Sequence, residues 1–230
     1  MKVLGSDFDN TIFFLNDPIQ TKKNIDAINK FREKGNIFCL ITGRTFKETK
    51  DIIKELNLSF DYLVCADGAM IFNKDLECIK LNTLDQDVAL KAIKILKDND
   101  YEPYIENGYE ITDTVVDCIK ISAEYSKDKE DAIRVAKILN DTLDVYAYAS
   151  RVHVNVNNPR NHKRQAVIDL SKIINIPLDN FYVIGDSIND YEMIEAYNSA
   201  VVKNYNKELE TLHPKVCESV AEYIEELMKN

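Results

Sequence analysis

Hydrophobic positions follow two different periods that alternate along the first third of the chain. Short apolar runs rich in β-branched and aromatic residues occupy positions 2–8, 36–42 and 61–66, as expected of buried strands. Apolar residues recur at helical spacing between these runs, over 21–35 and 45–57. Because strands and helices alternate, the pattern predicts a parallel sheet with right-handed crossovers.

The same alternation returns in the last third of the chain. It predicts a helix over 161–175, then a strand over 180–185, a helix from about Asn189, a short strand over 199–202 and an acidic C-terminal helix. The first of these helices places the following apolar side chains on one face: Ala166, Val167, Leu170, Ile173 and Ile174. These elements extend the predicted α/β sheet.

The middle of the chain has a different order of elements. Its pattern predicts helices over 88–100 and 129–141 and strands over 102–107, 108–113, 116–122, 144–150 and 151–157, with a hairpin turn at Asn107-Gly108. This antiparallel α+β block interrupts the α/β pattern. We therefore expect a doubly wound α/β core formed by residues 1–80 and 156–230, with a second domain inserted at 81–155.

The amino-acid composition and the net charge limit the kinds of molecule that the protein is expected to bind. The 230 residues are 45% hydrophobic, which is enough to bury a core, and they carry a net charge of −10. That charge argues against nucleic acid and anionic membranes as partners, although a bound divalent cation can still make an acidic cleft attractive to an anion. No apolar stretch has the length of a signal peptide or a membrane span, so we expect a cytoplasmic protein. The sequence leaves monomer and homodimer equally open.

The cysteines and histidines do not form a recognisable metal or disulfide pattern. The five cysteines are odd in number, contain no CxxC pair and mostly lie within apolar runs, which predicts buried thiols. The three histidines, His153, His162 and His213, are far apart. A structural zinc site is therefore not expected.

Two pairs of acidic residues follow predicted strands, where ligand sites of open α/β sheets gather. Asp7 and Asp9 end the first strand on the same face, so they can share a cation or divide the roles of nucleophile and acid. An ordinary acidic turn explains this pair as well. A calcium loop starting at Asp7 is excluded, because its sixth position is Ile12 and its twelfth is Pro18.

Three further segments have both a chemical and a structural interpretation. The run Thr42-Gly43-Arg44-Thr45 can hold a phosphate at a helix N-terminus or simply cap the helix. Gly185–Asp190 places Asp186 and Asp190 after another strand, and a helix cap explains only one of them. Lys163 lies in the first turn of a helix, where the dipole disfavours a cation, so it is either a paired functional lysine or a solvated one.

Together these segments resemble the haloacid dehalogenase (HAD) superfamily. They follow its motif order, with Asp7-Phe8-Asp9-Asn10-Thr11, then Thr42, Lys163 and Gly185–Asp190. The inserted block and the segment 65–71 are similar to the Cof-type metabolite phosphatases, which carry a C2-type (C2B) cap on a Rossmann-like core. Asn10 replaces the usual glycine, and Asp67 replaces the usual asparagine. Asn tolerates positive φ, so we expect the turn at Asn10 to form.

The resemblance implies a role for each motif residue. Asp7 is implied as the nucleophile that forms an aspartyl phosphate, and Asp9 as the acid and base that also offers its backbone carbonyl to a metal. The implied Mg²⁺ site consists of Asp7, that carbonyl and Asp186, with Asp190 behind them. The residues implied in phosphate binding are Thr42, Gly43 and Lys163, with Asn189 orienting the network. Arg44 and His153 are further candidates for contact with the leaving group, although a structural role explains each of them at least as well.

The implied activity is Mg²⁺-dependent hydrolysis of a small phosphorylated metabolite, either a sugar phosphate or a phosphoglycolate-like compound. Two alternatives remain open. A phosphomutase or phosphotransferase would use the same aspartate pair and differ only in the acceptor. A ligand-binding module without turnover is the third interpretation. The retention of the whole motif set argues against it, namely Asp7, Asp9, Thr42, Lys163, Asp186 and Asp190.

Overall fold

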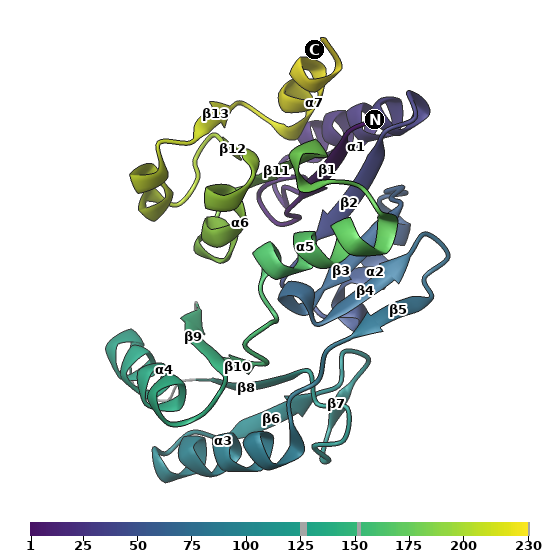
Figure 1. Cartoon of the computed structure of the whole chain (residues 1–230). Coiled ribbons are helices and arrows are strands. Elements are labelled where there is room, and N and C mark those ends of the chain that lie inside the picture. The colour runs from purple at the N-terminus through teal and green to yellow at the C-terminus, as the bar shows by residue number, and fades with distance from the viewer. Residues whose placement is uncertain (125–127, 151–152, 230) are drawn as a thin grey trace.

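The computed structural model describes residues 1–124, 128–150 and 153–229. Its larger sheet has the strand order β13-β12-β11-β1-β2-β3-β4-β5 (Figure 1). The parallel strands are β1 (Val3–Ser6), β2 (Ile37–Ile41), β3 (Tyr62–Cys65), β11 (Phe181–Gly185), β12 (Asn198–Val202) and β13 (Lys215–Cys217). The predicted α/β core is confirmed, and β1 lies at its centre between β2 and β11.

This sheet is mixed rather than purely parallel. β4 (Met70–Asn73) pairs antiparallel with β3, and β5 (Cys78–Leu81) pairs antiparallel with β4. The sequence analysis did not predict this hairpin. β4 is only four residues long and buried at its first three positions, so it lacks the alternating pattern that identifies a half-exposed strand.

Helices cover both faces of the larger sheet, as a doubly wound fold requires. They are α1 (Pro18–Glu33), α2 (Phe46–Glu55), α5 (Lys163–Ile174), α6 (Tyr191–Ala196) and α7 (Val220–Lys229). Short 3₁₀ turns are η1 (Ala66–Gly68), η2 (Leu178–Asn180), η3 (Ile188–Asp190) and η4 (Lys207–Leu212). The predicted buried face of α5 is confirmed for Ala166, Val167 and Leu170, whereas Ile173 lies at its margin and is 40% exposed.

The inserted block forms a separate antiparallel sheet, here called the cap sheet, with the order β7-β6-β8-β10-β9. Its strands are β6 (Pro103–Glu106), β7 (Ile111–Thr112), β8 (Lys120–Glu124), β9 (Tyr146–Ser150) and β10 (His153–Asn157). The helices α3 (Gln86–Asp98) and α4 (Lys129–Thr142) pack on its outer face, away from the larger sheet (Figure 1).

Most predicted elements of the cap are present, with one displacement. The hairpin at Asn107-Gly108 joins β6 to β7, and Gly108 has the positive φ of 87° that the turn requires. The strand predicted over 116–122 begins only at Lys120. Residues 151–152 of the last predicted strand lie outside the described residues.

Two asparagines join the segments that connect the sheets. The Asn158 side chain donates to the Thr83 carbonyl at 2.8 Å, and that of Asn161 donates to the Asn82 carbonyl at 3.2 Å. The predicted domain boundaries at residues 81 and 155 remain predictions. Four of the five cysteines are buried free thiols, and Cys78 is exposed. No helix within the described residues is long and apolar enough to cross a membrane.

Candidate active site

The candidate site forms where β1, β2 and β11 end at one edge of the larger sheet. The backbone amide of Asp7 donates to the Ile184 carbonyl at 3.0 Å, and that of Thr42 donates to the Val64 carbonyl at 2.9 Å. These bonds fix the first residue after each strand. Because parallel strands share one direction, residues far apart in the sequence meet at this edge.

Lys163 is paired, which resolves the two interpretations left open by the sequence. It is 1% exposed, and its Nζ lies 2.5 Å from Asp7 Oδ1 and 2.7 Å from Asp190 Oδ1. Burial lowers the pKa of Lys163, but the Asp190 and Asp7 carboxylates outweigh burial and hold the pKa above its ordinary value. Lys163 is therefore a cation that links two of the acidic motifs.

Three carboxylates converge beside this lysine. Oxygens of Asp7, Asp186 and Asp190 all lie within 4.8 Å of one another. Burial raises the pKa of Asp7 well above its ordinary value; Lys163 opposes this shift, while Asp190 and Asp186 add to it. Burial and Asp190 raise the pKa of Asp186 to about 6. One lysine cannot neutralise three carboxylates, and an all-oxygen donor set of this kind fits a hard divalent cation.

Asp190 organises the loop that carries Asp186. Its Oδ2 accepts hydrogen bonds from the backbone amides of Asp186 and Ser187, both at 3.0 Å. A Cβ on Gly185 would lie 2.4 Å from the Asp190 carboxyl carbon, so the glycine is needed for this close approach. The Thr11 hydroxyl donates to Asp186 Oδ1 at 3.2 Å. Thr11 belongs to the first sequence motif, but its hydrogen bond to Asp186 was not predicted.

Asp9 pairs with an arginine and is not part of the group of three carboxylates. Its oxygens accept two hydrogen bonds from the Arg44 guanidinium, at 2.6 and 2.7 Å. This bidentate pair raises the pKa of Arg44. The guanidinium also lies 5.5 Å from the centre of the Phe8 ring. Only the backbone carbonyl of Asp9 was assigned to the metal, and that assignment remains a prediction.

The turn after β2 caps helix α2 and is also a candidate for phosphate binding. Thr45 caps α2, because its hydroxyl accepts from the Glu48 amide while the Glu48 carboxylate accepts from the Thr45 amide. The Thr42 hydroxyl is buried and accepts from the Arg44 amide at 3.1 Å. The capping interpretation of this segment is confirmed. A phosphate-binding role for Thr42 and Gly43 remains compatible, because Thr42 and the start of α2 lie beside Asp7 at the same sheet edge.

The two departures from the family motif have defined conformations. Asn10 adopts the expected positive φ, at 57°. Asp67 has a φ of 55° and is 3% exposed. Its carboxylate accepts hydrogen bonds from the Asn189 side chain at 3.2 Å and from the Tyr148 hydroxyl at 2.9 Å. Tyr148 belongs to β9, so Asp67 joins the cap sheet to the candidate site.

Tyr148 was missed by the sequence analysis, although a signal was present. The alternation of tyrosine and alanine over 146–149 places both tyrosines on one face of β9, opposite the alanines that pack on the cap helices. His153, which was considered instead, lies at the start of β10 with its ring edge-on to Tyr104. Its predicted contact with a leaving group remains a prediction.

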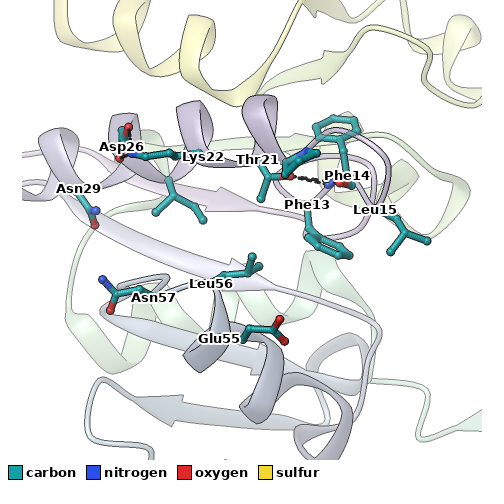
Figure 2. Close-up of a pocket in the computed structure, with 12 residues that line it drawn as sticks. Phe13, Phe14, Leu15, Thr21, Lys22, Asp26, Asn29, Glu55, Leu56 and Asn57 are labelled. Carbon is teal, nitrogen blue, oxygen red and sulfur yellow. Dashed lines mark hydrogen bonds and ion pairs between the residues drawn. The ribbon is translucent and has the colours of Figure 1, made fainter.

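An apolar pocket lies away from this acidic edge. A pocket of about 430 Å³ lies between the start of α1 and the end of α2, and its lining includes Phe13, Leu15, Ile25 and Leu56 (Figure 2). Its lining is mainly apolar and includes none of the predicted site residues. The acidic edge is therefore the better candidate for chemistry, because it has convergent charged groups with displaced pKa values.

The family predicted from the motifs is confirmed by sequence comparison. The family model of the haloacid dehalogenase-like hydrolases matches residues 4–117 and 104–223. An uncharacterized protein of Mycoplasma capricolum is 26% identical, with 90% of this chain and 92% of that protein covered. Phosphatase YwpJ of Bacillus subtilis is 23% identical, with 90% of this chain and 91% of that phosphatase covered.

Structural comparison supports the same architecture. A protein from Plasmodium vivax described as a HAD/COF-like hydrolase superposes with a TM-score of 0.81 at 20% identity, covering 100% of this chain and 96% of that one. At this identity the likeness concerns the fold, and it extends over both sheets. The chain therefore belongs to the haloacid dehalogenase-like hydrolase family and has the core-and-cap fold of the Cof-type phosphatases that its motifs resemble.

Proposed function

We propose that this chain is a Mg²⁺-dependent phosphatase that hydrolyses a small phosphorylated metabolite through an aspartyl phosphate on Asp7. The observation that carries the proposal is the buried cluster of Asp7, Asp186 and Asp190 around Lys163. The cluster lies at the carboxyl edge of the sheet, beside the start of α2. Its residue types match what phosphoryl transfer needs, namely a nucleophile, fixed positive charge and a cation site.

Asp7 and Asp9 would divide the covalent chemistry. An Asp7 carboxylate oxygen attacks phosphorus, so that an O–P bond forms as the bond to the leaving oxygen breaks. Asp9 gives its proton to that leaving oxygen. Asp9 then takes a proton from the water that cleaves the aspartyl phosphate, which releases phosphate and regenerates Asp7. Since Asp9 pairs with Arg44, we propose that Arg44 releases it and turns to the substrate phosphate when substrate binds.

The remaining motif residues would bind the phosphate and the cation and keep both in position. Lys163, Thr42 and the Gly43 amide would bind the phosphate oxygens, while Asn189 orients the loop beside them. Asp7, Asp186 and the Asp9 carbonyl would hold the cation, with Asp190 fixing the Asp186 loop through its backbone hydrogen bonds. Bound Mg²⁺ would supply positive charge that offsets the transferring phosphoryl group.

The test is phosphate release from a panel of sugar phosphates, phosphoglycolate, nucleotides and a chromogenic phosphate ester, with and without Mg²⁺. Metal-dependent release is expected, and Asp7→Asn serves as the inactive control. Transfer of the phosphoryl group to a second sugar without release of phosphate would favour the phosphotransferase. Absence of both reactions would contradict the proposal.

A further inference from the structure

Asp67 lies at a junction of four segments. It belongs to the turn η1, and its Oδ1 is 3.0 Å from the position that a Cβ on Gly43 would occupy. Asn189 donates to it from the loop after β11, and Tyr148 donates to it from the cap sheet. A carboxylate at this point is therefore adjacent to the proposed phosphate-binding turn and to the cap above that turn.

The backbone holds the Asp67 side chain in place. Ala66, Asp67 and Gly68 all have positive φ, at 50°, 55° and 115°, which is uncommon for the two residues that carry a Cβ. The Ala66 amide donates to the Arg44 carbonyl at 2.8 Å, and the Asp67 amide donates to the Thr42 carbonyl at 3.1 Å. These bonds tie the backbone of η1 to the turn after β2, and the Tyr148 and Asn189 donors hold the carboxylate itself.

The charge on Asp67 is only weakly compensated. Both donors to its carboxylate, the Tyr148 hydroxyl and the Asn189 amide, are neutral groups. Lys163 is close enough for Asp67 to raise its pKa, but that lysine makes its ion pairs with Asp7 and Asp190. Among the described residues, Asp67 therefore places a carboxylate that is held by neutral donors between the turn after β2 and the cap.

Among the described residues on the inner face of the cap sheet, no unpaired cation is available to neutralise the charge of Asp67. That face carries the neutral groups of Tyr146, Tyr148, Ser122, Asn155 and Asn157, which alternate with the residues packed on the cap helices. Of these, Tyr148 contacts Asp67 directly, and Ser122 donates to Glu106 on the same face. Lys120 is on the same face, with its Nζ 3.9 Å from Glu106. These hydroxyl and amide groups can both donate hydrogen bonds to a hydroxyl-bearing molecule and accept hydrogen bonds from it.

We infer that Asp67 determines specificity by selecting the leaving group. It favours substrates whose leaving group presents a hydroxyl or a protonated amine, and it disfavours those that carry a carboxylate. This inference rests on the proposed function and deepens it, because it selects the hydroxylated substrates over the phosphoglycolate-like ones that the sequence left open. Asp67 acts through its charge at the core–cap junction and has no part in the transfer step itself.

The experiment uses three phosphate monoesters of similar size that differ in one terminal group. They are 2-phosphoglycolate, 2-hydroxyethyl phosphate and phosphoethanolamine. Each is measured as a competitive inhibitor of chromogenic ester hydrolysis in the Mg²⁺-loaded protein. For the wild-type protein we expect the inhibition constant of 2-phosphoglycolate to exceed that of 2-hydroxyethyl phosphate by about tenfold or more, because like charges repel strongly in a partly buried site.

Asp67→Asn tests the origin of that discrimination. The variant keeps the shape of the side chain and removes its charge, so we expect the ratio of the two inhibition constants to fall at least about fivefold. Phosphoethanolamine is expected to bind more weakly to the variant. Asp75→Asn is the matched control: Asp75 is exposed in the turn between β4 and β5, so its loss changes net charge equally and leaves the ratio unchanged.

Failure of this inference is distinguishable from failure of the proposed function. If wild-type protein hydrolyses the chromogenic ester but binds 2-phosphoglycolate as well as 2-hydroxyethyl phosphate, Asp67 does not select the leaving group. An unchanged ratio in folded Asp67→Asn has the same meaning. The wild-type comparison decides the matter even if the variant does not fold. Loss of all hydrolysis in wild-type protein would instead remove the proposed function, and this inference with it.

Discussion

The carboxyl edge of the larger sheet and the inner face of the cap sheet both present polar groups, but they differ in charge. The sheet edge buries Asp7, Asp186 and Asp190 around one lysine. The cap face near it presents neutral groups such as Tyr148 and Asn155. Fixed charge is thus concentrated where the phosphorus would react, and neutral hydrogen-bonding groups lie where the variable part of a substrate would sit.

The difference has an energetic basis. Burying like charges together is unfavourable, and the raised pKa of Asp7 and of Asp186 reports that cost. A site tolerates such a cost where a bound cation offsets the clustered negative charges and allows a phosphate to bind beside them. The inner face of the cap sheet does not bury a cluster of like charges near the site, so its residues can differ according to the leaving group that the protein binds. Substitutions at the sheet edge should therefore alter turnover, whereas those at the cap face should alter substrate binding.

The largest effect is expected from Asp7→Asn. An amide cannot replace the carboxylate as nucleophile, so the rate constant for turnover should fall roughly 10⁴-fold or more. The fold should persist, because removing one of three clustered negative charges relieves repulsion. Phosphate release and a thermal melt check the two expectations. Near-normal turnover in this variant would exclude the covalent route.

Asp186→Asn should lower Mg²⁺-dependent turnover on the order of 10²-fold and reduce the rise in melting temperature that Mg²⁺ produces. Folding raises the pKa of Asp186 from 3.8 to about 6. A carboxyl with a raised folded-state pKa destabilises the protein increasingly as pH rises from about 4 to about 6. Without metal at pH 7, the variant should therefore melt at a higher temperature than wild type, and this difference should vanish below about pH 4. A lower melting temperature at pH 7 would contradict this reasoning.

Arg44→Lys should have an intermediate effect. Lysine keeps the positive charge but cannot form the bidentate pair with Asp9, so kcat/KM should fall about tenfold. Arg134→Lys, on the exposed surface of α4, is the control for a generic arginine replacement. An unchanged kcat/KM in Arg44→Lys would separate Arg44 from the chemistry.

Tyr148→Phe should produce the smallest effect and should alter binding rather than turnover. The variant removes the hydrogen bond from the cap sheet to Asp67, which is worth about 1.5 kcal/mol when the acceptor is charged, and leaves the ring in place. We expect KM for phosphate monoesters to rise about three- to tenfold, with kcat little changed. A fall in kcat with constant KM would place Tyr148 with the sheet edge instead of the cap face.

The sequence predicted more of the core than of the cap. Every predicted parallel strand is present, because each is a continuous apolar run whose period can be read locally. The strand predicted over 116–122 begins late, since Cys118 and Ile119 are buried in a loop and resemble strand residues in hydrophobicity alone. The hairpin β4–β5 was missed because β4 is buried at three consecutive positions and β5 is mostly exposed, so neither strand shows an alternating pattern.

The sequence by itself determined the α/β alternation, the inserted block and the order of the acidic motifs, because each depends on residues close together in the chain. Only the tertiary structure decided the partners of these residues. Arg44 meets Asp9 across 35 positions, and Tyr148 meets Asp67 across 81. No local pattern specifies such pairs. The first depends on how β1 and β2 align within the larger sheet, and the second depends on how the cap sheet lies over that sheet. The charge and spacing of the motif residues were therefore readable in advance, and the contacts that couple the cap to them were not.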